Sequence, residues 1–151
     1  MISLADFEKA VSGKTVLIDS NIIIYLTDSI LPYMALSRRL FEMIEVGEVS
    51  ALMSIVSVAE VMQGPLKKGL YLTALEVKDY LLNFPNLFCE AITDKILDVI
   101  GKDKRIQWSK LRTMDSLIIA SALKNNVDKI VSNDSHFKKA LPKRLLISFA
   151  S

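Results

Sequence analysis

The sequence predicts an α/β fold in which a central, mainly parallel and twisted β-sheet lies between two layers of helices, a three-layer α/β/α sandwich. The first observation behind this prediction is that short apolar segments of strand length alternate with longer segments in which apolar residues recur at helical spacing. The second is that residues favouring helix starts or ends stand at the junctions between these segments. Such alternation is typical of right-handed strand–helix–strand connections, which build parallel sheets.

The first predicted strand is the apolar segment Thr15-Val-Leu-Ile, which runs directly into Asp19. Ser20 and Asn21 are both favourable N-cap residues, and they open a second apolar segment that is expected to be helical. In open α/β sheets, ligands bind beyond the carboxyl ends of the strands, so Asp19 stands where chemistry is normally done. The alternative is that Asp19 only caps the following helix.

The elements after the first helix continue the alternation. Residues 33–46 place apolar side chains on one face and charged side chains on the other, as an amphipathic helix does. Ser57 and Glu60 have the spacing of a capping box, so the next helix is expected to begin at Ser57 and to end at Gly64-Pro65. Further helices are predicted at 69–84, 93–100, 113–124 and 134–140. Further strands are predicted at 49–56, 87–91, 129–132 and 144–149.

Length and composition limit the class of protein. The chain has 151 residues, of which 51% are hydrophobic, so residues 1–151 are expected to form one domain with a substantial core. The one cysteine, Cys89, excludes an internal disulfide and suits a reducing compartment. Asp6 and Glu8 interrupt the apolar start of the chain, and no apolar run approaches the length that spans a membrane. We therefore expect a cytoplasmic protein without a membrane partner.

Positive charge is concentrated in the last third of the chain. Residues 1–100 contain 8 Lys and Arg against 13 Asp and Glu, whereas residues 101–151 contain 11 against 4. One basic group consists of Lys102, Lys104, Arg105, Lys110 and Arg112. A second consists of Lys138, Lys139, Lys143 and Arg144. Clusters of this kind suit the backbone of a polyanion such as RNA, and ordinary solvated surface is the alternative.

Four acidic residues stand at strand ends or in the first turns of helices, namely Asp19, Glu60, Asp115 and Asp134. Each has a structural alternative, as a helix cap or as a favourable charge on a helix dipole. Right-handed crossovers bring the carboxyl ends of parallel strands to one edge of the sheet, so we expect the four acids to converge there.

Convergence has an energetic consequence. Two carboxylates about 4 Å apart repel by roughly 4 kcal/mol at an effective dielectric near 20, and helix ends, worth about 0.3–1 kcal/mol, cannot offset several such pairs. Either protonation or a cation must relieve the repulsion. The set contains no His or Cys, so its oxygen ligands favour Mg²⁺ or Mn²⁺, as in sites for phosphodiester hydrolysis. The hypothesis requires that these oxygens can share a metal and that none is buried against an Arg or Lys.

The four acids stand in the phrases Ile18-Asp19-Ser20-Asn21, Ser57-Val58-Ala59-Glu60-Val61, Met114-Asp115-Ser116-Leu117-Ile118-Ile119-Ala120-Ser121-Ala122 and Val131-Ser132-Asn133-Asp134-Ser135-His136-Phe137. These phrases resemble the successive acidic motifs of PIN-domain ribonucleases, in the same order and at similar spacing. The resemblance spans about residues 15–149. It implies a compact PIN-like parallel sheet and cleavage of RNA that depends on Mg²⁺ or Mn²⁺.

The same resemblance implies roles for individual residues. The catalytic residues and metal ligands would be Asp19, Glu60, Asp115 and Asp134. A second layer of support around them would come from Ser20 or Asn21, and from Ser132 or Asn133.

Among PIN proteins, the chain is similar in size to VapC-type toxins of toxin–antitoxin pairs. That similarity implies a homodimer and inhibition by an antitoxin that reaches into the acidic cleft. Residues 33–46 and 69–84 carry more apolar surface than an isolated helix layer needs, which suits a partner interface. Packing of both segments on the sheet is the alternative.

One segment departs from the VapC pattern, because residues 101–112 are longer and more basic than the lead-in expected before the third acid. Trp108, within this segment, either stacks on RNA bases or anchors the loop in the core, and the anchor is the favoured interpretation. His136, beside Asp134, is expected to be a surface residue.

Two functions of different classes therefore follow from the sequence. The first is a metal-dependent endoribonuclease acting on RNA, with the toxin of a type II toxin–antitoxin pair as its most specific form. The alternative is a non-catalytic PIN-like RNA-binding or scaffold protein, in which the four acids remain only as helix caps.

Overall fold

The computed structural model describes residues 1–150, and its centre is a five-stranded sheet in which every neighbouring pair of strands is parallel. The strands are β1 (Thr15–Ile18), β2 (Ser50–Ser54), β3 (Leu87–Glu90), β4 (Lys129–Val131) and β5 (Leu146–Ile147). Their order across the sheet is β3-β2-β1-β4-β5. All five carboxyl ends therefore lie at one edge, with β1 and β4 side by side.

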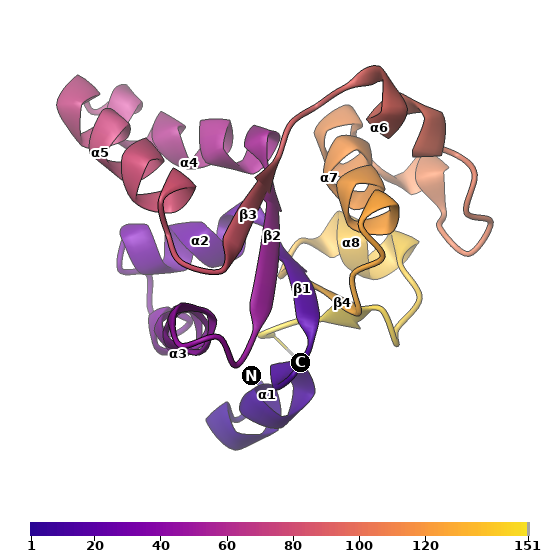
Figure 1. The fold of residues 1–151 in the computed structure, drawn as a ribbon, viewed down its shortest axis with the longest axis horizontal. Helices are drawn as coiled ribbons and strands as arrows, with labels where there is room; N and C mark the ends of the chain where they lie inside the picture. The colour runs from indigo at the N-terminus through magenta and orange to yellow at the C-terminus, as the bar shows by residue number, and fades with distance from the viewer. Residues whose placement is uncertain (151) are drawn as a thin grey trace.

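Helices cover both faces of this sheet. They are α1 (Leu4–Val11), α2 (Ser20–Thr27), α3 (Met34–Glu45), α4 (Ile55–Lys67), α5 (Tyr71–Leu82), α6 (Asp94–Val99), α7 (Thr113–Lys124) and α8 (Ser135–Ala140). Figure 1 shows α2 to α5 on one side of the sheet and α6 to α8 on the other, with α1 beside the two termini. The predicted three-layer α/β/α sandwich with a parallel sheet is confirmed. None of the helices within residues 1–150 is long and apolar enough to cross a membrane.

The alternating side chains of β1 explain why this strand is apolar throughout. Val16 and Ile18 belong to the hydrophobic cluster beneath α1 to α5, whereas Leu17 belongs to the cluster beneath α7 and α8. Successive residues of a strand point to opposite faces, so a strand covered on both sides needs apolar residues at every position. This double burial holds β1 in the middle of the molecule and fixes the position of the residue that follows it.

The boundary between β2 and α4 differs from the prediction. β2 ends at Ser54, whose side-chain oxygen accepts the backbone N–H of Val56 at 3.1 Å and so caps α4. The predicted capping box that starts at Ser57 is therefore wrong, because Ser57 lies inside the helix. The predicted stop at Gly64-Pro65 is also wrong, since α4 continues to Lys67.

Candidate active site

The four predicted acids line one pocket at the carboxyl edge of the sheet. Asp19 follows β1 and Asp134 follows β4, while Glu60 comes from α4 and Asp115 from the first turn of α7. The pocket has a volume of about 260 Å³, and its other lining residues are Ser20, Asn21, Ile24 and Arg112. The chain leaves β1 toward β2 on one side and later returns to β4 on the other, so this is the topological switch point where α/β sheets bind ligands.

Asp19 is the N-cap of α2 and is only 4% exposed. Its Oδ1 accepts the backbone N–H of Ser20 at 2.8 Å, and its Oδ2 accepts the hydroxyl of Ser132 at 2.7 Å. Burial is the main reason that the pKa of Asp19 is raised to about 6, with the hydrogen bonds from Ser132 and Ser20 opposing the rise and the charges of Asp134 and Asp115 adding to it. The cap of α2 is thus Asp19 itself, as the capping alternative held, and not Ser20 or Asn21.

Glu60 reaches into the pocket from α4, and its Oε1 atom is buried without a hydrogen-bond partner. The pKa of Glu60 is raised, first because burial disfavours its charge and then because Asp19 lies nearby. A buried carboxylate oxygen without a donor is unfavourable unless a proton or a cation meets it. Within residues 1–150, no Lys or Arg nitrogen lies within 4.0 Å of the carboxylate of either Asp19 or Glu60.

Arg112 lies between the other two acids of the pocket. Its Nε and Nη2 atoms donate to the carboxylate of Asp115 at 2.8 and 3.0 Å, and Nη2 also donates to Oδ2 of Asp134 at 2.7 Å. These carboxylates raise the pKa of Arg112, mainly through the hydrogen bonds to Asp115.

This pairing corrects one expectation from the sequence. The nuclease hypothesis required that none of the four acids be buried against an Arg or Lys. That requirement is met by Asp19 and Glu60 but not by the other two acids. Asp115, with a side chain that is 5% exposed, and Asp134, with one that is 20% exposed, both pair with Arg112. The guanidinium itself lies at the open side of the pocket, with 59% of the Arg112 side chain exposed. Arg112 therefore pairs with two of the four carboxylates, and the two that remain unpaired, Asp19 and Glu60, are those with raised pKa values.

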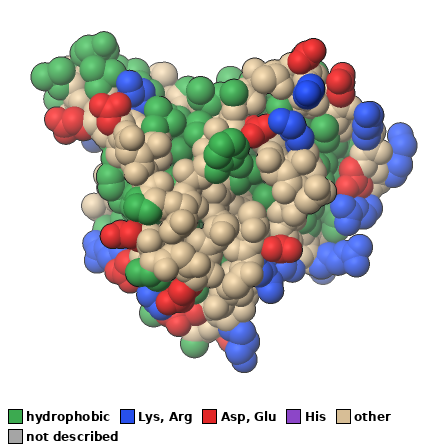
Figure 2. Space-filling model, in the orientation of Figure 1, with side chains coloured by type: hydrophobic (Ala, Val, Ile, Leu, Met, Phe, Trp, Pro, Cys, Tyr) green, Lys and Arg blue, Asp and Glu red, His purple; other side chains and the backbone are tan. Residues whose placement is uncertain are grey.

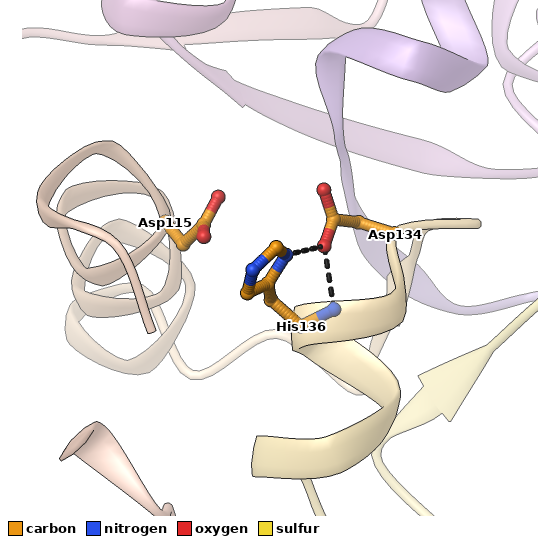
Figure 3. Close-up of side chains that lie close together, drawn as sticks. All are labelled: Asp115, Asp134 and His136. Carbon is orange, nitrogen blue, oxygen red and sulfur yellow. Dashed lines mark hydrogen bonds and ion pairs between the residues drawn. The ribbon is translucent and has the colours of Figure 1, made fainter. Parts of the chain in front are cut away.

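His136 lies next to two of the acids that line the pocket, and Figure 3 shows its ring between Asp134 and Asp115. Its Nδ1 atom lies 3.0 Å from Oδ1 of Asp134, which also accepts the backbone N–H of His136 at 2.7 Å. Asp115, Asp134 and His136 each offer one ligand atom, and these atoms all lie within 4.8 Å of one another. The side chain is 41% exposed, but it turns toward the acids rather than away from them. In the sequence, the available signal for this orientation was the position of His136 two residues after Asp134, which caps α8.

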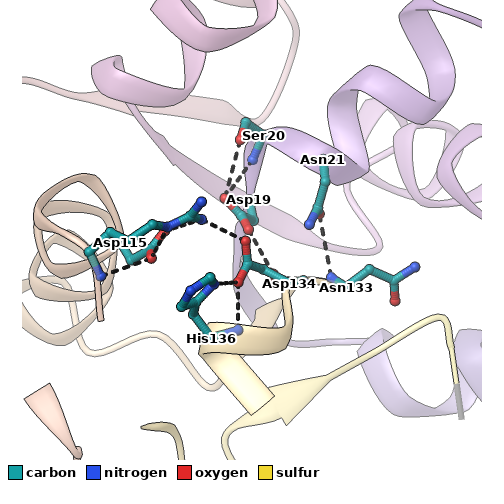
Figure 4. A network of polar contacts seen from close by, with 9 residues as sticks. Asp19, Ser20, Asn21, Asp115, Asn133, Asp134 and His136 are labelled. Atoms are coloured by element: carbon teal, nitrogen blue, oxygen red, sulfur yellow. Dashed lines mark hydrogen bonds and ion pairs between the residues drawn. The ribbon is translucent and has the colours of Figure 1, made fainter. Parts of the chain in front are cut away.

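The four residues expected to support the acids have different contacts (Figure 4). Ser132 donates to Asp19 and accepts the backbone N–H of Asp134 at 3.0 Å, so it joins the ends of β1 and β4. Ser20 contacts Asp19 through its backbone N–H and, at 3.4 Å, through its hydroxyl.

The two asparagines lie further from the acids. Asn21 lines the pocket, and its Oδ1 accepts the backbone N–H of Asn133 at 3.4 Å. The side chain of Asn133 turns toward the C-terminal segment, where its Oδ1 accepts the backbone N–H groups of Phe149 and Ala150 at 2.8 and 2.9 Å. Asn133 therefore holds the end of the chain and contacts no carboxylate of the pocket.

The basic segment that ends at Arg112 is anchored by Trp108. The ring packs against the hydrophobic cluster beneath α7 and α8, and its indole N–H donates to the carbonyl of Asp103 at 3.0 Å. Lys102, Lys104 and Lys110 are exposed, whereas Arg105 pairs with Asp103 at 2.7 Å. Figure 2 shows Lys and Arg side chains gathered on the side of the molecule that carries α6 to α8.

Asp19 and Glu60 are the acids of the pocket that remain available to a divalent cation by their chemistry, whereas the described residues that bring three ligand atoms within 4.8 Å of one another are Asp115, Asp134 and His136. The carboxylates of Asp19 and Glu60 offer hard oxygens, which suit Mg²⁺ or Mn²⁺. The unpartnered Oε1 atom of Glu60 is the clearest indication, because a cation would supply the contact that no donor of the described chain provides.

Residues 16–140 match the PIN domain. The chain belongs to the PIN domain family. The matched range contains all four acids of the pocket, and the predicted resemblance to the PIN family is confirmed. None of the curated proteins matches the chain.

Solved structures of toxins and toxin–antitoxin complexes have a similar fold. VapBC2 from Rickettsia felis, bound to a DNA fragment from its promoter, has a TM-score of 0.66 at 18% identity and covers 89% of this chain and 98% of its own. A toxin–antitoxin complex from Klebsiella pneumoniae has a TM-score of 0.62 at 17% identity, covering 87% and 95%. Mycobacterium tuberculosis VapC20, a toxin that cleaves the sarcin–ricin loop, has a TM-score of 0.60 at 12% identity, covering 82% and 93%. At these identities the likeness is one of fold.

Proposed function

We propose that this PIN domain is a metal-dependent endoribonuclease that hydrolyses RNA phosphodiester bonds with Mg²⁺ or Mn²⁺, and that it is the toxin of a type II toxin–antitoxin pair in the cytoplasm. The observation that carries the proposal is the meeting of Asp19, Glu60, Asp115 and Asp134, from four separate elements, in one pocket at the switch point of the sheet. Helix capping alone explains three of these acids, but it does not explain the buried oxygen of Glu60.

The residues of the pocket divide the work of such a site. A divalent ion, when bound, would polarise a phosphoryl oxygen and lower the pKa of a water molecule. Asp19 and Glu60 would hold it, since neither carboxylate is paired with a Lys or Arg of the described chain. Ser132 fixes the carboxylate of Asp19 through a 2.7 Å hydrogen bond, so the ligand is oriented before any ion arrives. Asp115 and Asp134 border the same space from the other side.

Protein partners are part of the proposal. Similarity in fold to VapBC complexes supports an antitoxin, and we also propose a homodimer. Of the two segments expected to carry extra apolar surface, α3 buries its apolar face in the core. α5 and the residue before it leave large apolar side chains exposed, namely Leu70, Tyr71, Leu72, Tyr80 and Leu82. The α5 surface is therefore the better candidate for a protein interface.

RNA contacts are proposed for the basic segment that ends at Arg112, at the exposed side chains Lys102, Lys104 and Lys110. Because Arg105 and Arg112 are already paired with carboxylates, these lysines are the free cations of the segment.

The test is a cleavage assay with a matched pair of variants. Glu60→Gln should abolish Mn²⁺- or Mg²⁺-dependent cleavage of RNA, whereas Glu76→Gln, the same change on the exposed surface of α5, should leave cleavage intact. Circular dichroism should show that both variants fold. Equal activity of the two variants would refute the assignment of the pocket.

The alternative is a non-catalytic PIN-like RNA-binding or scaffold protein. The observations that favour it are the ion pairs of Arg112 and the capping role of Asp19 and Asp134. This alternative predicts that the folded protein does not bind Mn²⁺, so calorimetric titration with Mn²⁺ separates the two functions.

A further inference from the structure

Arg112 is the one cation of the described chain that lines the acidic pocket. We propose that Arg112 acts as a built-in second cation, so that the chain holds one divalent ion, at Asp19 and Glu60, while the guanidinium takes the place of another ion between Asp115 and Asp134. This inference rests on the proposed metal-dependent function and specifies how that site is divided.

The contacts of Arg112 are confined to one half of the pocket. Two of its nitrogens meet the carboxylate of Asp115, and one of these also meets Asp134 at 2.7 Å. Charge-assisted contacts in this paired geometry are among the stronger hydrogen bonds in proteins, and an Arg side chain does not lose its charge. Asp19 and Glu60 receive no such contact from a Lys or Arg of residues 1–150, so the need for a cation is concentrated in their half.

The half occupied by Arg112 has the ligands of a metal site. Asp115, Asp134 and His136 offer three atoms within 4.8 Å of one another, and Arg112 already bridges two of these residues. The carboxylate of Asp115 does not depend on the Arg112 side chain for its position, because it also accepts the backbone N–H of residue 112 at 3.1 Å. Removing the guanidinium should therefore leave the three ligands in place and open them to an ion.

Helix stabilisation does not account for this arginine. Arg112 stands at the N-cap of α7, where the helix dipole disfavours a positive charge. Its side chain has no oxygen with which to accept a hydrogen bond from the first turn of the helix. The position is favourable only because of the carboxylates that face it, which indicates a role in the pocket.

The guanidinium also keeps donors for a substrate. Within the described chain its Nη1 atom has no hydrogen-bond partner, and the side chain is 59% exposed. Arginine pairs readily with phosphate oxygens, so these remaining donors suit a phosphate of the RNA backbone.

The number of bound ions tests the proposal without an activity measurement. Mn²⁺ bound per chain is counted by calorimetry, with electron paramagnetic resonance of free Mn²⁺ as an independent count. The proteins are the full wild-type chain, Arg112→Gln and the matched control Arg105→Gln, which removes an equally charged side chain that pairs only with Asp103. We expect one ion for the wild type and the control, and two ions for Arg112→Gln. Adding His136→Ala to Arg112→Gln should return the count to one.

The outcomes distinguish a failure of the proposed role of Arg112 from a failure of the proposed metal-dependent function. Two ions in the wild type, or one in a folded Arg112→Gln protein, would overturn the role of Arg112 while leaving a metal-dependent site. Retention of the second ion without His136 would overturn the ligand set of the second position. No Mn²⁺ binding by the wild type would instead remove the proposed function itself. If Arg112→Gln does not fold, the wild-type count alone decides between one ion and two.

Discussion

Replacing Asp19 by Asn is expected to make the metal-free protein more stable at neutral pH, although the substitution exchanges a carboxylate N-cap of α2 for a neutral amide. In the folded chain Asp19 is almost completely buried, and its pKa is raised from 3.8 to about 6, chiefly by that burial. Asn retains a side-chain oxygen that can accept the N–H of Ser20, and Asp and Asn are N-caps of similar strength. The substitution therefore removes the buried charge while keeping most of the cap.

The sign and size of the effect follow from the two pKa values. A carboxyl group that binds its proton more tightly in the folded state favours folding fully below pH 3.8, and this contribution is lost as the pH rises through about 6. The difference between 3.8 and about 6, at about 1.36 kcal/mol for each pH unit, gives a loss of about 3 kcal/mol above pH 6. The amide that Asp19→Asn introduces does not titrate, so the variant should gain about 2–3 kcal/mol at pH 8 and roughly half as much at pH 5.

The assay is urea unfolding followed by circular dichroism, with EDTA present, at pH 5 and pH 8. The control is Asp98→Asn, because Asp98 is an exposed residue of α6. Its unfolding free energy should change by no more than about 0.5 kcal/mol at either pH. If Asp19→Asn were less stable than the wild type at pH 8, or if its advantage were the same at both pH values, the argument from burial of the charge would be refuted.

Three further substitutions test other parts of the structure. Ser132→Ala removes a hydrogen bond that lowers the pKa of Asp19, so the pKa of Asp19 should rise further. Mn²⁺ affinity, measured by calorimetry, should fall about 10- to 100-fold. Unchanged affinity would contradict the role of Ser132 in orienting Asp19. Trp108→Phe keeps the apolar ring but loses the indole N–H donor, so it should lower the unfolding free energy by about 1 kcal/mol in urea and leave RNA affinity unchanged; weaker RNA binding would favour base stacking instead. Lys124→Met leaves the buried carboxylate of Glu90 without its 2.5 Å partner and should lower the unfolding free energy by about 2 kcal/mol. The loss is smaller than for a fully buried pair because the Lys124 side chain is 35% exposed. A urea midpoint equal to that of the wild type would show that the pair contributes nothing to stability.

The layers of the fold could be predicted because the central strand, β1, carries its own indication of burial. Both faces of β1 are apolar, because Val16 and Ile18 point to one side and Leu17 to the other. This pattern is stable only in a strand that is covered on both sides. The boundary at α4 could not be predicted in the same way, since Ser54 and Ser57 are both suitable caps three residues apart. The choice is made by the sheet: Ser54 still pairs with Glu90 of β3, and the chain is free to turn into a helix only after it.

The convergence of the four acids could be predicted from their positions in the sequence, whereas the orientation of the Arg112 side chain toward them could not. Strand ends and first helical turns converge in any parallel sheet, so Asp19 and Asp134 were expected to meet once β1 and β4 were adjacent. Arg112 looked like the last member of a basic segment. Its orientation depends on the path of the whole loop, which Ile106 and Trp108 fasten to the core, and no local pattern specifies that path.

Capping and metal binding are not mutually exclusive for these acids. A carboxylate has about four acceptor positions, and Asp134 uses one oxygen for the N–H of His136 while its other oxygen meets Arg112. In the same way, Asp19 caps α2 with one oxygen and contacts Ser132 with the other. A loss of stability on substituting either residue would therefore not argue against a metal site. Only the binding of a divalent ion distinguishes a cap that also serves as a ligand from one that does not.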